Sequence, residues 1–264
     1  EMKIGIIGVG IIGGACKYGF EKLGHKVICH DIALDTNIED VLDTQITYIC
    51  VPTPSDEDGS CNTSIVESVV HELHGLGYSG IVAIKSTVKP TTTEKLIKET
   101  GMEICFVPEF LRERCSISDF TENHDLLAIG TYSQTTYEMV KLCHGNYPKN
   151  HSHLTPTEAE LLKYYSNVIN ALKVVFANEM YEICKTVGAD YTQIKETFIK
   201  RGTTKDLYLD VNDNFRGYAG MCLPKDTKAL DSFVKELGLD LKLFETMESE
   251  NNKFKKTVFS GMRL

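Results

Sequence analysis

The chain has 264 residues, of which 42% are hydrophobic and 25% are charged, and its formal net charge at pH 7 is −9. This composition is typical of a globular enzyme with one large or two modest domains, and the negative charge argues against a nucleic-acid partner, because phosphate binding requires clustered Lys and Arg. No apolar run approaches the roughly 18 residues of a membrane span, and the chain opens on a strand-like segment that leaves no room for a signal peptide, so we expect a cytoplasmic protein.

From the N-terminus to about residue 150, short apolar runs alternate with amphipathic stretches. Helical patterns such as Thr63–Leu76 and Thr91–Glu99 fall between runs that are rich in Ile and Val, as strands buried on both faces are. The runs are Lys3–Val9, Lys26–His30, Ile46–Val51, Ile81–Lys85, Glu103–Val107 and Leu126–Ile129. This alternation predicts an α/β fold, a Rossmann-like doubly wound parallel sheet, for residues 1–150.

A polar stretch, Tyr147–His153, is expected to end this domain. Thr155, Pro156 and Glu158 then give a helix start, and no Pro or Gly follows before Val187, so one helix of roughly thirty residues is predicted. Such a helix is too long for a small domain, and we expect it to span two domains or a subunit interface. Helical patterns near 191–200, 225–237 and 241–256 complete a mainly helical central domain, residues 151–264.

The first predicted strand is followed directly by three spaced glycines, Gly8, Gly10 and Gly13. In this context Gly8 makes a tight turn, Gly10 lets the backbone approach a pyrophosphate, and Gly13 lets helix and strand pack closely. Free N–H groups and the helix dipole would meet the phosphate charge. Asp31, at the end of the second strand, can accept both ribose hydroxyls and would repel a 2′-phosphate, so the pattern predicts NAD rather than NADP.

The nine cysteines stand alone, without Cys-x-x-Cys pairs or matched His spacing, so no metal site is predicted. Cys222 differs from the others because it follows the glycines of Gly217–Gly220 and precedes Pro224, which suits the first turn of a helix. A thiol there lies near exposed N–H groups and the positive end of a dipole, both of which favour the thiolate. A lone Cys is more often buried packing, but these neighbours favour a catalytic nucleophile.

Four further segments carry specific sequence motifs: Val51–Pro54, Lys85–Val88, Pro108–Glu113 and Glu160–Asn167. Lys163 and Asn167 lie four residues apart and share a helix face, which on spacing alone favours a solvated surface. Together with Gly217–Thr227, however, the ordered set closely resembles the UDP-glucose/GDP-mannose dehydrogenase family over essentially the whole chain, and most of all its UDP-glucose 6-dehydrogenase branch.

The resemblance implies an NAD-dependent enzyme that oxidises the C6 alcohol of a UDP-sugar to a carboxylate in two steps, through a thiohemiacetal and a thioester on a cysteine. The resemblance also implies the catalytic residues, which are Cys222, Lys163, Asn167, Asp226, Thr87 and Glu113. Cofactor contacts fall to Gly8, Gly10, Ile11, Ile12, Gly13, Asp31, Thr53, Thr87, Glu113 and Lys225, and substrate contacts to Glu109, Phe110, Leu111, Lys163, Asn167, Ala219 and Gly220.

Family members normally continue into a second nucleotide-binding-like domain that clasps the UDP, and this domain is expected to be absent here. A homodimer through the long helix is implied by the resemblance. Two other readings stay open: a single-step dehydrogenase of the 3-hydroxyacid or 6-phosphogluconate type, which needs no thiol, and a catalytically silent NAD-binding or dimerisation module.

Overall fold

The structure is a computed structural model, and it describes residues 1–254. The chain divides into two compact units. Unit 1 comprises Glu1–Pro54 and Cys61–Lys163, and unit 2 comprises Ser55–Ser60 and the chain from Tyr164 onward. The domain limits drawn from the sequence, 1–150 and 151–264, stay a prediction beside this division.

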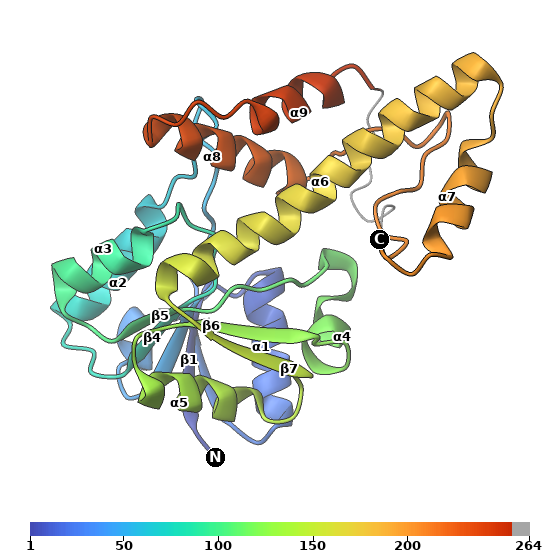
Figure 1. Ribbon diagram of the computed structural model, residues 1–264. Coiled ribbons are helices and arrows are strands. Elements are labelled where there is room, and N and C mark those ends of the chain that lie inside the picture. The colour runs from blue at the N-terminus through green and yellow to red at the C-terminus, as the bar shows by residue number, and fades with distance from the viewer. Residues whose placement is uncertain (255–264) are drawn as a thin grey trace. The chain divides into compact units, whose positions relative to one another are not determined.

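Unit 1 is built on a seven-stranded sheet in the order β2-β1-β3-β4-β5-β6-β7 (Figure 1). The strands β2, β1, β3, β4 and β5 pair in parallel with one another, and β6 is antiparallel to β5, which it meets at the single pair Phe106 and Gly130. The predicted Rossmann-like sheet is confirmed, with this one reversal. The strands are β1 (Lys3–Ile7), β2 (Lys26–His30), β3 (Ile46–Ile49), β4 (Ile81–Ile84), β5 (Ile104–Phe106), β6 (Leu126–Gly130) and β7 (Asn150–Leu154).

The interpretation of Tyr147–His153 as a polar stretch that ends the domain was wrong, because Asn150–Leu154 forms the edge strand β7. Its backbone pairs with β6 in parallel over five residue pairs, from Leu126 with Asn150 to Gly130 with Leu154. The side chains of β7 are half-buried or exposed. Because hydrogen bonds between the two backbones hold this edge strand, its side chains do not need the apolar pattern that marks the inner strands.

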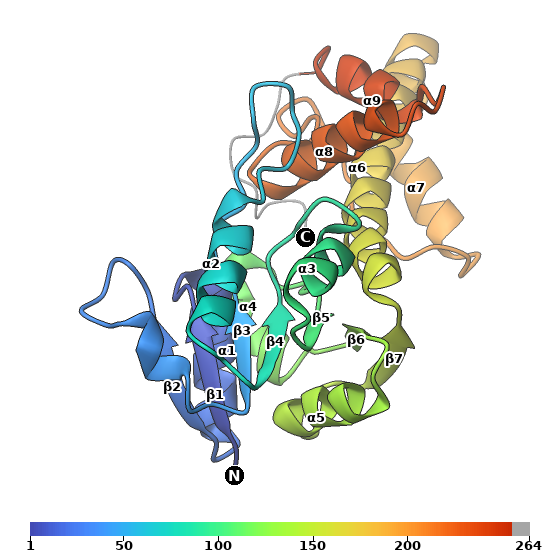
Figure 2. The same cartoon turned by 90° about the vertical axis from the view of Figure 1, so that its left-hand side faces the viewer.

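Helices cover both faces of the sheet, as Figure 2 shows from the side. On one face α1 (Ile11–Lys22), α4 (Ser116–Thr121) and α5 (Gln134–His144) contribute Phe20, Phe120 and Val140 to one buried cluster. The other face is covered by the 3₁₀ helix η1 (Ile38–Val41), by α2 (Ser64–Gly75) and by α3 (Thr92–Thr100). Both clusters are dominated by Ile, Val, Leu and aromatic side chains, whose burial supplies the main stabilisation of the unit.

The strand order reverses direction between β1 and β3. The chain leaves β1 towards β2 on one side, and it returns to β3 and proceeds to β4 on the other. In open α/β sheets the crevice outside the carboxyl ends of the strands at such a point is the usual ligand site. The turn after β1, which carries Gly8, opens at this point.

Unit 2 is mainly helical. The long helix α6 (Pro156–Val187) has 32 residues, which confirms the predicted length; its residues up to Lys163 belong to unit 1. The helix predicted near 191–200 corresponds to α7 (Tyr191–Ile199). The helix predicted near 225–237 corresponds to α8 (Cys222–Glu236), which begins three residues earlier. The helix expected at 241–256 is α9 (Leu243–Asn251), and residues 255 and 256 lie outside the described residues.

The helices α8 and α9 pack against each other and against α6 within unit 2 (Figure 1). The shared cluster contains Val168 and Val175 from α6, Tyr218 from the loop before α8, and Met247 from α9. This packing positions the segment that leads into Cys222.

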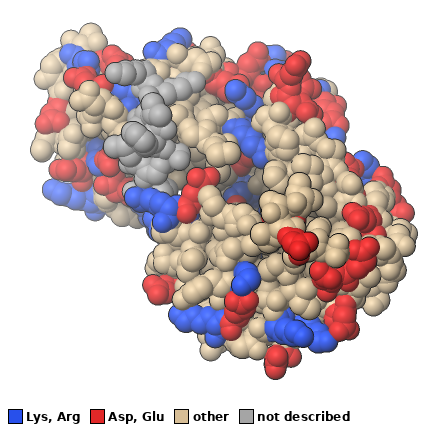
Figure 3. All heavy atoms as spheres, turned by 180° about the vertical axis from the view of Figure 1, so that it is seen from behind, with Lys and Arg blue, Asp and Glu red and all other residues tan. Residues whose placement is uncertain are grey.

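The surface carries acidic and basic side chains in an interspersed arrangement on the face drawn in Figure 3. Among residues 1–254, no helix combines the length and the apolarity that crossing a bilayer requires.

Candidate functional site

The glycine turn has the geometry that each of its glycines was predicted to need. Gly8 has φ +92°, which a residue with a side chain rarely adopts, and a Cβ at this position would lie 2.6 Å from the carbonyl oxygen of Cys50. A Cβ on Gly13 would lie 1.9 Å from the carbonyl oxygen of Gly8. At Gly10, the residue that caps α1, a Cβ would meet nothing within 4 Å, so the backbone there is open to a close-lying group.

The N-terminus of α1 fits a pyrophosphate. Ile11, its first residue, is half exposed, whereas Ile12 is partly buried against the core, and the first turn contains no acidic residue. The backbone N–H groups of a first helical turn have no partner within the helix, and the helix dipole adds positive potential. The open backbone at Gly10 therefore leaves room for an anion at the point where the helix favours one.

Asp31 lies directly after β2 and fits the predicted ribose contact. Its Oδ2 accepts the N–H of Val9 at 2.7 Å, and its Oδ1 accepts the N–H of Ala33 at 2.9 Å. These two backbone hydrogen bonds, that of Ala33 first, lower the pKa of the Asp31 carboxyl, so it is ionised at neutral pH. Each oxygen keeps a further lone pair for a hydroxyl donor. The residues that line the turn therefore suit a dinucleotide without a 2′-phosphate.

The segments that follow β3 and β4 carry Thr53 and Thr87. Thr53 is buried, and Thr87 is half-buried, with its carbonyl oxygen accepting the thiol of Cys61 at 3.5 Å. Both lie at the carboxyl ends of neighbouring strands, the edge that also carries the glycine turn. Their predicted contact with the cofactor stays a prediction.

The segment Pro108–Glu113 meets Lys163 within unit 1. The Lys163 ammonium donates to the backbone oxygen of Glu109 and lies 3.3 Å from its Oε1, while the ring centroid of Phe110 lies 5.5 Å away. Glu109 also accepts the N–H of Leu111 at 2.8 Å through Oε2. Lys163 is therefore held, almost buried, against two of the predicted substrate residues, Glu109 and Phe110. Glu113 is exposed and begins the short 3₁₀ helix η2 (Glu113–Cys115).

Sequence reasoning missed the residue that fixes this segment. Asp119 in α4 accepts the N–H of Arg112 at 3.0 Å, and its two oxygens accept Nε and a terminal nitrogen of the Arg112 guanidinium at 2.9 and 2.8 Å. Such a two-point ion pair fixes orientation as well as distance. Arg112 stands inside the quoted motif, but nothing in the sequence identified Asp119 as its partner.

In unit 2, Cys222 is the first residue of α8, as the position before Pro224 predicted. It is the exposed one of the nine cysteines, all of which lie in the described part of the chain; the others are buried or half-buried. The preceding loop turns through Gly217 and Gly220, with φ +61° and +87°. Ala219 is half-buried and Gly220 is exposed in this loop. The thiol therefore stands at the N-terminal end of a helix, where the dipole favours its anion.

Asp226 and Asn167 lie together in the same unit. The Asn167 amide donates to Asp226 Oδ2 at 2.6 Å, and Asp226 is buried. Since Asp226 stands four residues after Cys222 on α8, the carboxylate and the thiol share one side of the helix. Three of the predicted catalytic residues are thus brought to one place, and Lys225 lies between the thiol and the carboxylate in sequence.

Two buried asparagines hold the loop before Cys222, and no sequence pattern indicated either of them. The side chain of Asn251 in α9 accepts the N–H of Tyr218 at 2.7 Å and donates to its carbonyl oxygen at 3.0 Å. Asn178 in α6 accepts Nε of Arg216 at 2.7 Å and the N–H of Gly217 at 3.3 Å. Buried polar side chains that satisfy backbone groups in this way fix a loop to its helices.

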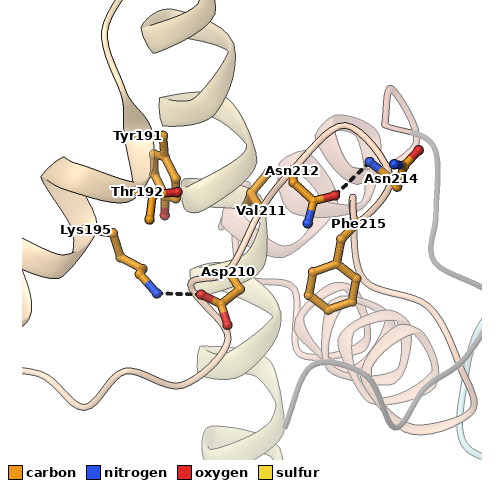
Figure 4. A pocket seen from close by; sticks show the side chains of 8 residues that line it. All are labelled: Tyr191, Thr192, Lys195, Asp210, Val211, Asn212, Asn214 and Phe215. Atoms are coloured by element: carbon orange, nitrogen blue, oxygen red, sulfur yellow. Dashed lines mark hydrogen bonds and ion pairs between the residues drawn. The ribbon is translucent and has the colours of Figure 1, made fainter.

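Two cavities of about 460 Å³ each lie in unit 2. One flanks the first turn of α8 and is lined by Met221 and Lys225, by Lys228 and by the acidic segment 55–59. The other, drawn in Figure 4, lies between α7 and the segment 210–215; there the ammonium of Lys195 pairs with Asp210. The first cavity borders predicted site residues, whereas the second contains none of them.

The fold and the glycine turn define a dinucleotide-binding oxidoreductase. Two family models match the chain: that of the UDP-glucose/GDP-mannose dehydrogenase family, NAD binding domain, over residues 33–147, and that of the central domain of the same family over residues 157–253. The chain belongs to the UDP-glucose/GDP-mannose dehydrogenase family, and its cofactor is NAD.

Relatives and solved structures agree with this assignment. The chain is 27% identical to the UDP-glucose 6-dehydrogenase of Haloferax volcanii, with 95% of this chain and 70% of that protein covered. It is 26% identical to the GDP-mannose 6-dehydrogenase of Pseudomonas aeruginosa, with 97% and 70% covered. A UDP-glucose dehydrogenase from the archaeon Pyrobaculum islandicum superposes with a TM-score of 0.87 at 27% identity, over 96% of this chain and 68% of that one.

Proposed function

We propose that this protein is an NAD-dependent UDP-glucose 6-dehydrogenase. The proposed reaction converts UDP-glucose, two NAD and water to UDP-glucuronate, two NADH and protons. NAD, held at the glycine turn by Gly8, Gly10 and Asp31, supplies a hydride acceptor for each of the two oxidations. The observation that carries the proposal is the exposed Cys222 thiol at the start of α8, with Asp226 one helical turn further on and hydrogen-bonded to Asn167.

In this mechanism the Cys222 thiolate forms a C–S bond to C6 once the alcohol has been oxidised to an aldehyde. The resulting thiohemiacetal loses a second hydride and becomes a thioester, which water hydrolyses to the carboxylate and the free thiol. Sulfur suits both stages, because it is a strong nucleophile as the thiolate and a good leaving group from the thioester. The position of Cys222 at a helix N-terminus supports the thiolate form.

The other predicted site residues have complementary tasks in the proposal. The Lys163 ammonium and the second N–H of the Asn167 amide stabilise the negative oxygen that develops at C6 in each tetrahedral stage. Asp226 orients the hydrolytic water and accepts its proton, assisted by Thr87 and Glu113. Glu109, Phe110, Leu111, Ala219 and Gly220 contact the sugar, while Lys225 and Thr53 contact the cofactor.

The test of the nucleophile uses the exposure of Cys222. Iodoacetamide is expected to alkylate Cys222 before the other eight cysteines, because these are buried or half-buried. Cys222→Ser and Cys222→Ala are expected to abolish steady-state turnover of UDP-glucose to UDP-glucuronate, because the second oxidation requires the thiol, with NAD affinity unchanged in calorimetry. Full turnover by an alkylated or Cys222→Ala protein would exclude covalent catalysis by this residue and would favour a single-step dehydrogenase.

The choice of UDP-glucose needs its own test, since relatives named for UDP-glucose and for GDP-mannose match at 27% and 26% identity. UDP-glucose is expected to give the highest kcat/KM in parallel assays with GDP-mannose and UDP-N-acetylmannosamine. Faster oxidation of GDP-mannose would reassign the substrate. Tight NAD binding without oxidation of any of these sugars would identify a silent NAD-binding module.

We also propose a homodimer formed through α6. The support is a row of exposed apolar side chains four or seven residues apart along the helix, at Tyr165, Ile169, Phe176, Ile183 and Val187. Such spacing is typical of a helix seam that packs on another helix. Sedimentation equilibrium is expected to give the dimer mass, and Phe176→Glu to shift it towards the monomer; a monomeric wild-type protein would contradict the proposal.

A further inference from the structure

One fully buried carboxylate in unit 1 has no part in the proposed mechanism. Glu160 in α6 is 0% exposed, and three donors surround it. Its Oε1 accepts the backbone N–H of Thr91 at 2.9 Å, and its Oε2 accepts both the N–H and the hydroxyl of Thr93 at 3.0 Å. Three such donors offset part of the desolvation that burial imposes on a carboxylate.

The donors belong to the start of α3, which lacks a cap of its own. Thr91, the residue before the helix, has φ +80°, and its side chain makes no capping hydrogen bond. The N–H groups of a first helical turn need acceptors from outside the helix, and the dipole favours an anion there. Glu160 supplies both from α6, and so joins α6 to the start of α3.

The segment in front of α3 carries Thr87, and it is fastened at both ends. At its beginning, the N–H of Lys85 donates to the carbonyl oxygen of Ile49 at 2.9 Å, and the hydroxyl of Ser86 donates to that of Val51 at 2.7 Å. At its far end the fastening is the carboxylate of Glu160. The backbone around Thr87 is therefore held by hydrogen bonds to β3 and the residues after it on one side, and to Glu160 of α6 on the other.

Lys163 follows Glu160 by three residues, so the two side chains leave the same helix on neighbouring positions. The ammonium of Lys163 reaches Glu109 on one side, and the carboxylate of Glu160 reaches the start of α3 on the other. We propose that Glu160 is a positioning residue that fixes the Thr87 segment relative to Lys163. Thr87 and Lys163 act at the reacting atoms in the proposed function, on which this inference rests.

The test compares Glu160→Gln with Glu158→Gln. Gln has the shape of Glu, but its amide nitrogen is a donor and would face the donors at Thr91 or Thr93. Glu158 is an exposed residue in the first turn of the same helix and serves as the matched control. The first measurement is hydrogen–deuterium exchange of the peptides that cover residues 85–93, which requires no activity.

Glu160→Gln is expected to raise exchange in 85–93, and Glu158→Gln to leave it unchanged. In steady-state assays kcat of Glu160→Gln is expected to fall about 10- to 100-fold, because misplacement of a catalytic group by about 1 Å has this effect. A purely structural role would lower the melting temperature and the folded fraction but not kcat per folded molecule.

Unchanged exchange in Glu160→Gln would overturn the inference, whatever the activity of the protein. Raised exchange with an unchanged kcat would overturn the positioning role as well. If the wild-type protein oxidised no nucleotide sugar, the proposed function would fail, and calorimetry with UDP-glucose would then decide: weaker binding by Glu160→Gln than by Glu158→Gln supports the inference, and equal binding refutes it.

Discussion

The glycine turn offers a sharp perturbation, because two adjacent glycines of α1 differ in what a methyl group would meet. A Cβ on Gly13 would lie 1.9 Å from the carbonyl oxygen of Gly8 and 3.3 Å from Cγ2 of Ile6. A Cβ on Gly14 would meet nothing within 4 Å. Gly13→Ala is therefore expected to displace the turn, whereas Gly14→Ala is its matched control.

The magnitude follows from the overlap. Since Cβ atoms essentially never approach within 3.0 Å of a carbonyl oxygen, the backbone at Gly8 must move by about 1 Å, and overpacking of this kind costs about 1–3 kcal/mol of stability. The same movement withdraws N–H groups from the phosphates. Loss of one hydrogen bond to a charged group costs about 1.5–3 kcal/mol, which corresponds to a roughly 10- to 100-fold weaker Kd for NAD.

Gly14→Ala is expected to have the opposite effect on stability. Ala in a helix interior is favoured over Gly by about 0.5–1 kcal/mol, and the Kd for NAD should stay that of the wild type. Urea unfolding and calorimetric titration with NAD measure both quantities. Equal NAD affinity in Gly13→Ala and Gly14→Ala would refute the proposed role of the close contact between Gly13 and Gly8.

Three further predictions concern single side chains. Burial raises the pKa of Glu160 from 4.5 to about 7, so between these values the folded state holds a proton that the unfolded state releases. The free energy of unfolding is expected to fall by roughly 3 kcal/mol as the pH rises from 4.5 to 7; urea titrations of Glu160→Gln that keep this slope would contradict the assignment. Asn251→Leu should lower the free energy of unfolding by about 2–4 kcal/mol, because it leaves the N–H and the carbonyl oxygen of Tyr218 buried without partners; a loss below 1 kcal/mol would argue against this anchor. Asp31→Asn is expected to weaken NAD binding at least tenfold and to reduce the preference for NAD over NADP, since a charged ribose acceptor contributes about 1.5–3 kcal/mol. An unchanged ratio of the Kd for NADP to the Kd for NAD in calorimetry would refute that role.

Much of the fold was predictable because its signals are local. The inner strands are short apolar runs, the glycine turn has a fixed spacing, and the 32-residue helix α6 is bounded by a capping signal and a glycine. The edge strand β7 was not predictable, because hydrogen bonds to β6 hold it and its side chains carry no apolar alternation. The antiparallel direction of β6 relative to β5 was not predictable either, because it depends on the path of the connecting chain and not on a local sequence pattern.

The candidate site divides in the same way. The position of Cys222 at the start of α8 follows from Pro224 and the glycines before it. The hydrogen bond between Asn167 and Asp226 joins residues far apart in the sequence, and helical spacing reveals only which face each one occupies. The support from Asn178 and Asn251 is of the same long-range kind, since a buried asparagine within a helix has no sequence signature of its partner.

The central claim is that one protein oxidises a sugar alcohol twice, the second time while the sugar is bound to the thiol of Cys222. The most direct measurement is the end-point yield of NADH when UDP-glucose is limiting and NAD is in excess. Two NADH and one carboxylate are expected for each UDP-glucose consumed. One NADH for each sugar, with an aldehyde or ketone as the product, would contradict it.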